Sequence, residues 1–175
     1  KELDMLASLI DGMNEGGEGI NAGAAVGKRG ETETGNKNGN NMSTALGIIE
    51  MCYGDTGLLL SMPRQGLGNS AIAAVANDEQ LERFKGTWAA MAITEPGCGS
   101  DSAAIRTTAT QDGDEYILNG EKIFVTSGDR ADSVVVWATL DKKLGRAAIK
   151  SFVVPKGTAG MKVERLEHKL GIKAS

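Results

Sequence analysis

Residues 91–101 read Met-Ala-Ile-Thr-Glu-Pro-Gly-Cys-Gly-Ser-Asp, an apolar stretch that stops abruptly in a tight polar loop. Pro96 fixes its own backbone φ angle and removes a hydrogen-bond donor, while Gly97 and Gly99 allow backbone conformations that other residues avoid. Such a loop exposes amides and hydroxyls, which can bind a polar or anionic ligand without any net positive charge. The same composition fits an ordinary turn at the end of a strand. From composition alone the turn is the simpler interpretation, and both stay open.

The sequence after this loop predicts further short strands. β-Branched and apolar residues recur in short runs separated by residues that favour turns, which is typical of an all-β domain. Asn119 and Gly120 separate two of these runs and form the strongest short hairpin pattern of the chain. This spacing predicts an antiparallel β-barrel or β-sandwich. The expected strands cover residues 88–94, 103–110, 115–118, 121–126, 133–140, 147–154 and 161–166.

The sequence before the loop has the period of helices instead. Apolar residues recur there at three- and four-residue spacing. Asp55 is placed to cap one short helix, and Asn77 with Gln80 matches a capping box at the start of another. Helices are expected over residues 2–13, 42–54, 57–62, 67–76 and 78–84, with a glycine-rich loop over 14–41.

The two halves together predict an α+β fold, with an N-terminal helical domain over residues 1–86 followed by an antiparallel β-barrel or β-sandwich domain over residues 87–175. Hydrophobic residues make up 41% of the chain but aromatic residues only 4%, so the cores must be built largely from Ala, Val, Ile, Leu and Met. The net charge of −4 disfavours non-specific binding to nucleic acid, because such binding needs clustered Lys and Arg.

Cys52 and Cys98 are too few for a disulfide framework or a zinc site. No apolar run approaches the about 20 residues that span a bilayer, and the first residues lack the basic and apolar pattern of a signal peptide. A cytoplasmic protein is therefore expected, or one of the mitochondrial matrix if the source is eukaryotic. Because the chain starts at Lys1 rather than Met and stops at Ser175 within continuing structure, a fragment is expected.

Two glycine-rich stretches imitate nucleotide-binding motifs. Residues 66–71 match the letters GxGxxA, but helical sequence precedes them where a dinucleotide fingerprint needs a strand. Residues 23–28 resemble a phosphate-binding loop, but they are one residue short and Arg29 takes the position of the metal-binding Ser or Thr. Helix packing and a flexible loop are expected instead. His168, the single histidine, has no nucleophile or metal ligand at useful spacing and is expected at a solvated strand end.

The loop at residues 91–101 closely resembles the signature of the acyl-CoA dehydrogenase family, in which a TEPxxGSD loop lines the flavin and acyl-CoA site. Further segments match in the same order. Residues 119–128, Asn-Gly-Glu-Lys-Ile-Phe-Val-Thr-Ser-Gly, are similar to the family's NGxKxxITNG hairpin, and residues 132–140 and 151–154 resemble the strands that follow it. Residues 169–175, Lys-Leu-Gly-Ile-Lys-Ala-Ser, look like the family's K-x-G-x-[RK]-x-S segment.

This resemblance is highly specific over residues 87–175, moderate over 42–86 and weak over 1–41. It implies site residues only where the motifs match position by position. Ser100 is the residue expected to form a hydrogen bond with the cofactor or the acyl-CoA substrate. The cofactor-binding positions that the resemblance implies are Met91, Ile93, Thr94, Gly99, Ser100, Phe124 and Thr126.

Three of these positions carry more detailed expectations. Thr126 matches the threonine that approaches the reactive edge of the flavin ring. Phe124 occupies a position often held by tryptophan, so it should keep the apolar packing over the ring but lose the indole donor. Cys98 replaces a residue that is commonly alanine, and it is expected to be a small filler rather than a reactive thiol, because no Lys, Arg or His adjoins it in sequence.

The resemblance implies an oxidoreductase that uses FAD to introduce an α,β double bond into an acyl-CoA thioester, as in fatty-acid β-oxidation. It also implies a homo-oligomer and an electron-transfer flavoprotein or similar acceptor as partner. The family's base is a glutamate of a C-terminal helical domain that no segment here resembles, and Glu95 does not match it. The chain alone is therefore expected to have no catalytic residue and no activity. A related flavin oxidase or monooxygenase, and a non-catalytic partner subunit of the same fold, are the alternatives.

Overall fold

A computed structural model describes residues 40–61 and 67–174, and the chain forms two compact units. The first unit runs to Trp88 and includes His168–Ser175, and the second is Ala89–Glu167. The helix predicted over residues 2–13, nearly all of the loop predicted over 14–41, and the stretch at 23–28 lie outside the described residues. The division into domains at residues 86 and 87 stays a prediction.

Helix α2, Asn40–Ser61, is two helices that meet at Asp55. Asp55 has an extended backbone there, with φ −164° and ψ 113°. Its carboxylate Oδ1 accepts a hydrogen bond from the amide of Leu58 at 3.0 Å, which satisfies an amide at the start of the second helix. The predicted break near Gly54 and the predicted cap at Asp55 are therefore confirmed.

Helix α3, Leu67–Val75, and helix α4, Asp78–Phe84, follow the sequence expectations closely. The capping box of α4 is complete. The Asn77 side chain accepts from the Gln80 amide at 2.9 Å, and the Gln80 side chain accepts from the Asn77 amide at 3.0 Å. Gly66 of the GxGxxA stretch lies outside the described residues, but Asn69 is buried in α3 and donates to the Thr87 carbonyl at 2.7 Å. Packing within this unit is therefore the role that the structure gives to Asn69.

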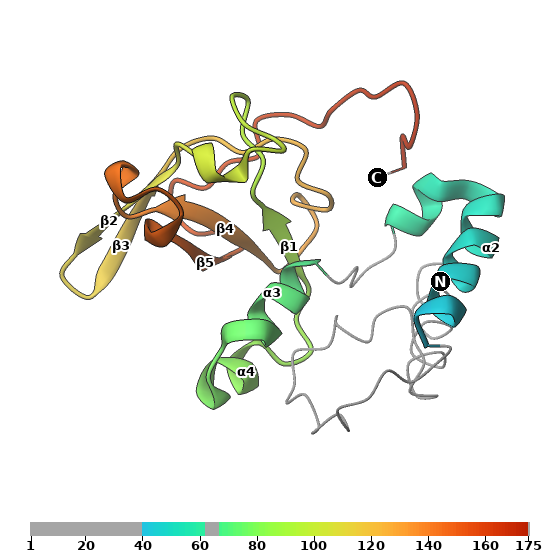
Figure 1. The fold of residues 1–175 in the computed structure, drawn as a ribbon, viewed down its shortest axis with the longest axis horizontal. Helices are drawn as coiled ribbons and strands as arrows, with labels where there is room; N and C mark the ends of the chain where they lie inside the picture. Colours follow the sequence, from blue (N-terminus) through green and yellow to red (C-terminus); the bar gives the residue numbers. More distant parts are fainter. Residues whose placement is uncertain (1–39, 62–66, 175) are drawn as a thin grey trace. The chain divides into compact units, whose positions relative to one another are not determined.

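The second unit is built on a five-stranded sheet around β4 (Figure 1). Its strands are β1 (Ala89–Ala92), β2 (Thr108–Asp112), β3 (Glu115–Asn119), β4 (Ser133–Thr139) and β5 (Ile149–Pro155). Strand β5 pairs with β4 antiparallel along its whole length, and β1 pairs with β4 in parallel. Strand β2 touches β4 at one position, Thr108 opposite Thr139, and forms a hairpin with β3. Two short 3₁₀ helices, Ser102–Ala104 and Lys142–Ala148, lie between strands.

The prediction of an antiparallel barrel or sandwich was wrong in two respects. The pairs β1·β4 and β2·β4 are parallel, which is possible because a long connection separates the strands of each pair. Among the described residues β3 pairs only with β2 and β5 only with β4, so the sheet is open. The α+β class itself is confirmed.

The predicted Asn119–Gly120 hairpin was also wrong. The hairpin turn lies at Gly113 and Asp114, between β2 and β3, and residues 120–125 form no strand. Gly120 has a different role, because a Cβ atom there would lie 2.7 Å from Thr107 Cα. The strand expected over residues 161–166 does not form either, and His168 is exposed outside any strand.

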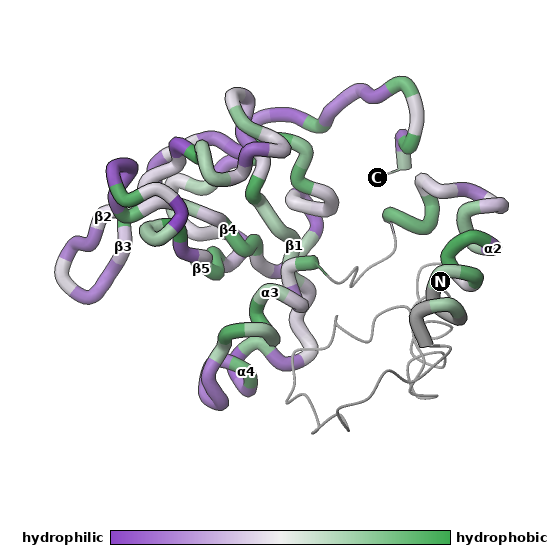
Figure 2. Tube along the Cα trace, viewed as in Figure 1, coloured by the Kyte–Doolittle hydropathy of each residue, from purple (hydrophilic) through white to green (hydrophobic). Residues whose placement is uncertain are grey.

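Small side chains dominate the core of the sheet. Ala89, Ala90, Val134, Val135 and Ala138 are all buried, as the low aromatic content requires. Figure 2 shows hydrophobic residues along β4 and hydrophilic ones at the tip of the β2–β3 hairpin. Within the described part of the chain, no helix combines the length and hydrophobicity needed to cross a membrane.

Candidate functional site

The polar loop begins where β1 ends, and a small backbone turn closes it. The amide of Glu95 donates to the Cys98 carbonyl at 3.0 Å, and the amide of Cys98 donates back to the Glu95 carbonyl at 3.1 Å. Pro96 and Gly97 lie exposed at the tip of this turn, whereas the Cys98 side chain is buried. A buried thiol inside a turn agrees with the small filler predicted from the sequence.

The Glu95 carboxylate organises the surroundings of the turn. The Glu95 side chain is only 6% exposed. Its carboxylate is bound by residues 106 and 107, before β2, and by Lys122, after β3. Its Oε1 accepts from the Thr107 amide at 2.9 Å, from the Thr107 hydroxyl at 2.6 Å and from Lys122 Nζ at 2.8 Å. Its Oε2 accepts from the Arg106 amide at 2.6 Å.

These partners determine the charge state of Glu95. Burial by itself would raise the pKa of this carboxyl, but the hydrogen bonds from Lys122, Thr107 and the Arg106 amide outweigh it and lower the pKa from 4.5 to about 2. A general base needs a pKa near the working pH and a free lone pair aimed at the substrate. Glu95 is therefore a structural carboxylate, as its position in the sequence motif also implies.

The segment after Gly120 lies against the end of β1. The amide of Ile123 donates to the Thr94 carbonyl at 2.9 Å, and Lys122 Nζ donates to the Ile93 carbonyl at 3.1 Å. These bonds bring together two regions whose bonded residues lie 29 residues apart in the sequence. Thr94 and the segment that carries Phe124 and Thr126 are thus neighbours.

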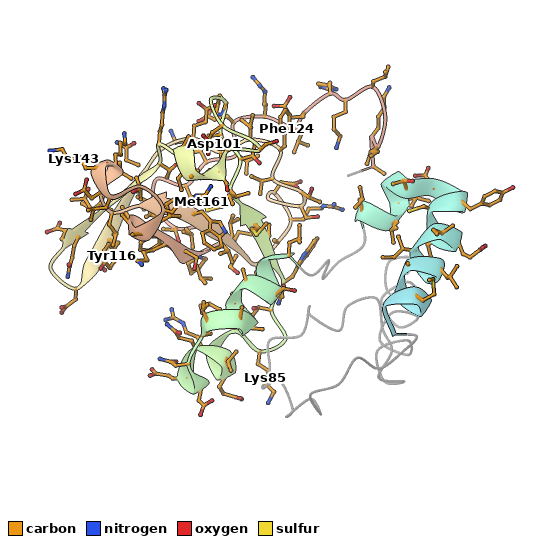
Figure 3. The ribbon with its side chains drawn as sticks, in the orientation of Figure 1. Lys85, Asp101, Tyr116, Phe124, Lys143 and Met161 are labelled. Carbon is orange, nitrogen blue, oxygen red and sulfur yellow. The ribbon has the colours of Figure 1, made fainter. Side chains whose placement is uncertain are left out.

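The backbone of this segment is strained. Phe124 and Ser127 have φ angles of 56° and 61°, in the left-handed region that non-glycine residues rarely adopt. Phe124 is 66% exposed, so burial of its ring within this chain does not explain the conformation. Strained, exposed residues of this kind are concentrated at ligand sites. Figure 3 shows Phe124 and Asp101 along the same border of the β-unit in this view.

The predicted site residues differ in how available they are. Met91 lies on β1 opposite Val135 and is half-buried, as are Ile93 and Thr94. Gly99, Ser100 and Thr126 are exposed. No side chain in the described ranges forms a hydrogen bond with the hydroxyls of Ser100 or Thr126, and none links these two residues to each other.

The glycines of the loop are open rather than strained. A Cβ atom on Gly97 or Gly99 would meet nothing within 4 Å, and neither residue has a positive φ angle. The fold of the described residues therefore does not explain why glycine stands at either position. Open space above glycine backbone, next to exposed hydroxyls, fits the close approach of a flat or polar ligand.

Sequence reasoning missed Lys122 and Thr107, two of the side chains that bind Glu95. A third is the buried Cys98 thiol, whose Sγ donates to Oε2 at 3.9 Å. The pattern that could have pointed to Lys122 is a lysine directly before the apolar run that begins at Ile123. Thr107 carried no such pattern, because its role follows from the close approach of Gly120.

The chain is similar in sequence to known acyl-CoA dehydrogenases. Residues 90–175 match the family model described as acyl-CoA dehydrogenase, middle domain. The chain is 36% identical over 151 residues to a short-chain-specific acyl-CoA dehydrogenase of Clostridium acetobutylicum, an alignment that covers 82% of this chain and 40% of that protein.

Two solved structures are similar in fold as well as sequence. Butyryl-CoA dehydrogenase of Megasphaera elsdenii matches with a TM-score of 0.69 and 31% identity, over 88% of this chain and 42% of that one. A glutaryl-CoA dehydrogenase of Mycobacterium smegmatis, solved in complex with FADH2, matches with a TM-score of 0.65 and 30% identity, over 75% of this chain and 35% of that one. The chain thus spans about two fifths of the length of the relative from Clostridium acetobutylicum.

Proposed function

Because the chain belongs to the acyl-CoA dehydrogenase family, we propose that it forms one wall of the flavin and acyl-CoA site of an enzyme that introduces an α,β double bond into an acyl-CoA thioester. The observation that carries this proposal is the open loop at Gly97 and Gly99 beside the exposed, strained segment that carries Phe124 and Thr126. The bond from the Ile123 amide to the Thr94 carbonyl holds the two parts together.

The donor set of this surface fits FAD. The ring system of a flavin needs an apolar face and a few hydrogen-bond donors at its edge, and it needs space to approach backbone closely. Phe124 offers exposed apolar area, Thr126 an exposed hydroxyl without a partner in the described chain, and Gly99 an open backbone. The residues that would hold the cofactor are Met91, Ile93, Thr94, Gly99, Ser100, Phe124 and Thr126.

When bound, FAD would supply the acceptor for the hydride that leaves the acyl β-carbon. The chain's own residues bind and orient. The Ser100 hydroxyl would donate a hydrogen bond to the cofactor or the thioester substrate. The half-buried Met91 and Ile93 would present apolar surface. Glu95 takes no part in proton transfer, because its oxygens are already bound by Thr107, Lys122 and the Arg106 amide. We assign no catalytic base among the described residues.

The experiment that tests this function uses the full-length protein. It should purify with a bound yellow flavin, and the flavin absorbance should bleach when a short- or long-chain acyl-CoA is added without oxygen. A colourless protein that is indifferent to added FAD contradicts the proposal. Rapid return of the colour on admission of air would indicate an oxidase of the same scaffold, and slow return a dehydrogenase that passes its electrons to an electron-transfer flavoprotein or similar acceptor.

A further inference from the structure

The Glu95–Lys122 ion pair is almost completely withdrawn from water. The two side chains are 6% and 9% exposed, and their charged atoms are 2.8 Å apart. Burying two opposite charges carries a desolvation cost that their attraction often only offsets, so such a pair adds little stability beyond what apolar residues of similar volume would give. Selecting one arrangement of the joined segments is the contribution expected of it instead.

The pair joins three stretches of chain that are distant in sequence. Glu95 lies in the turn that follows β1, and its carboxylate is bound by the amides of Arg106 and Thr107 before β2. Lys122 comes from the segment after β3 and reaches both Glu95 and the Ile93 carbonyl. One carboxylate therefore fixes the end of β1, the approach to β2 and the start of the 122–128 segment.

The strained residues follow directly after this anchor. Ile123 is bound through its amide to the end of β1, and Phe124, the next residue, is already left-handed. At the far side Ser127, the second left-handed residue, accepts a hydrogen bond from the Arg130 amide at 3.0 Å. Left-handed conformations of non-glycine residues persist only where their surroundings hold them. The Lys122 anchor is the constraint at the upstream end.

We propose that Glu95 is a positioning residue of the flavin site: acting through Lys122 and Thr107, it holds the 122–128 segment so that Phe124 and Thr126 face the cofactor. This inference rests on the proposed function for the cofactor, but the positioning itself concerns only the chain. Glu95 does not touch the ligand in this arrangement. Its effect passes through Lys122 and the Ile123 amide to the residues that do.

The double variant Glu95→Gln with Lys122→Met tests this directly. Glutamine has one acceptor oxygen, so it keeps the bonds from Thr107 or the bond from the Arg106 amide but not both. Methionine fills the space of the lysine stem, so the anchor is removed and no buried charge is left unpaired. Removal of the anchor should expose the Ile123 amide, which should exchange its hydrogen about tenfold faster. The dissociation constant for FAD, measured by flavin fluorescence on the apoprotein, should rise about tenfold.

The matched control is Glu167→Gln. It breaks the Arg165–Glu167 pair, which has the same 2.8 Å separation but an Arg165 side chain that is 74% exposed. Exchange at Ile123 and the FAD dissociation constant should not change in this variant. Lys122→Arg keeps the cation and should retain most of the FAD affinity that the double variant loses. A folded double variant with wild-type exchange at Ile123 and wild-type FAD affinity overturns the proposal.

A milder variant covers the case in which the double variant does not fold. Thr107→Val keeps the side-chain shape and removes only the hydroxyl that binds Glu95 at 2.6 Å. It should speed exchange of the Ile123 amide and weaken FAD binding, each about threefold; wild-type values for both would overturn the proposal. If the wild-type protein does not bind FAD, the proposed function fails, and hydrogen exchange at Ile123 still decides whether Glu95 positions the segment.

Discussion

Gly120 lies directly against Thr107, so closely that a Cβ atom on the glycine would be 2.7 Å from Thr107 Cα. The neighbouring atom belongs to the backbone, and no rotation of a side chain can make room for it. Thr107 is also the residue that binds Glu95 through both its amide and its hydroxyl. Any displacement at Gly120 is therefore transmitted to the carboxylate that joins the end of β1 to the 122–128 segment.

Gly120→Ala should destabilise the protein by about 2 kcal/mol, because the methyl group must push Thr107 away from Glu95. Unfolding by denaturant measures this loss. Gly47→Ala is the control, since a Cβ atom at Gly47 meets nothing within 4 Å and the residue lies within helix α2. Wild-type stability of Gly120→Ala would show that the backbone at Thr107 yields without cost.

Gly99→Ala should weaken ligand binding without lowering the stability of the fold. A Cβ atom at Gly99 meets nothing within 4 Å, so the free energy of unfolding should stay within about 0.5 kcal/mol of the wild type. The dissociation constant for FAD or for acyl-CoA should nevertheless rise about tenfold, because the methyl group occupies the space that the ligand needs. Unchanged binding of both ligands would remove Gly99 from the site.

The sequence predicted best what depends on neighbours in the chain. The capping box of Asn77 and Gln80, the break at Asp55 and the extents of β4 and β5 all follow from local patterns of hydrogen bonding and hydrophobicity. Strand pairing is different, because the partner of β1 is β4, beyond a long stretch that carries the whole β2–β3 hairpin. No local sequence pattern in β1 predicts whether β4 runs parallel or antiparallel to it.

The Asn119–Gly120 hairpin failed for a reason of the same kind. Asn119 and Gly120 are residues that favour a tight turn, and the residues that follow them favour a β-strand. The competing interaction is tertiary: Lys122 binds Glu95 and Ile123 binds Thr94, so the segment is held against the end of β1 instead of folding back on β3. These tertiary contacts of Lys122 and Ile123 therefore determine where the predicted site residues Phe124 and Thr126 lie.

Acid should weaken the fold through Glu95. Its pKa is lowered to about 2 in the folded protein, so its contribution is complete above the unfolded value near 4.5 and is lost as the pH falls toward 2. Between pH 6 and pH 3 the wild type should lose roughly 2 kcal/mol more stability than Glu95→Gln. Denaturant unfolding at each pH measures the difference, with Glu167→Gln expected to follow the wild type. Identical pH profiles for the wild type and Glu95→Gln would contradict the buried, paired state of this carboxyl.

The strain at Phe124 can be separated from its role in binding. At a left-handed φ of 56°, glycine should be more stable than alanine by about 1 kcal/mol, so Phe124→Gly should unfold at higher denaturant than Phe124→Ala. At the exposed strand residue Ile117 the order of the same two substitutions should reverse. Both Phe124 variants should bind FAD more weakly than the wild type, since both remove the ring. Equal stability of the two Phe124 variants would mean that the segment relaxes once the ring is gone.

A variant of Thr126 can separate an effect on the rate of flavin reduction from an effect on ligand binding. Its hydroxyl is exposed and has no hydrogen-bond partner within the described chain, so Thr126→Val should leave the fold intact. If the hydroxyl supports the reactive edge of the flavin, this variant should slow flavin reduction by acyl-CoA about tenfold, because a hydrogen bond that strengthens as charge develops contributes more to the barrier than to binding. The dissociation constant for the CoA ester should change by less than about threefold. Thr110→Val, at an exposed position of β2, is the control, and stopped-flow bleaching without oxygen measures the rate. Equal reduction rates in the Thr126→Val variant and the wild type would exclude Thr126 from the reacting edge, even if FAD binds.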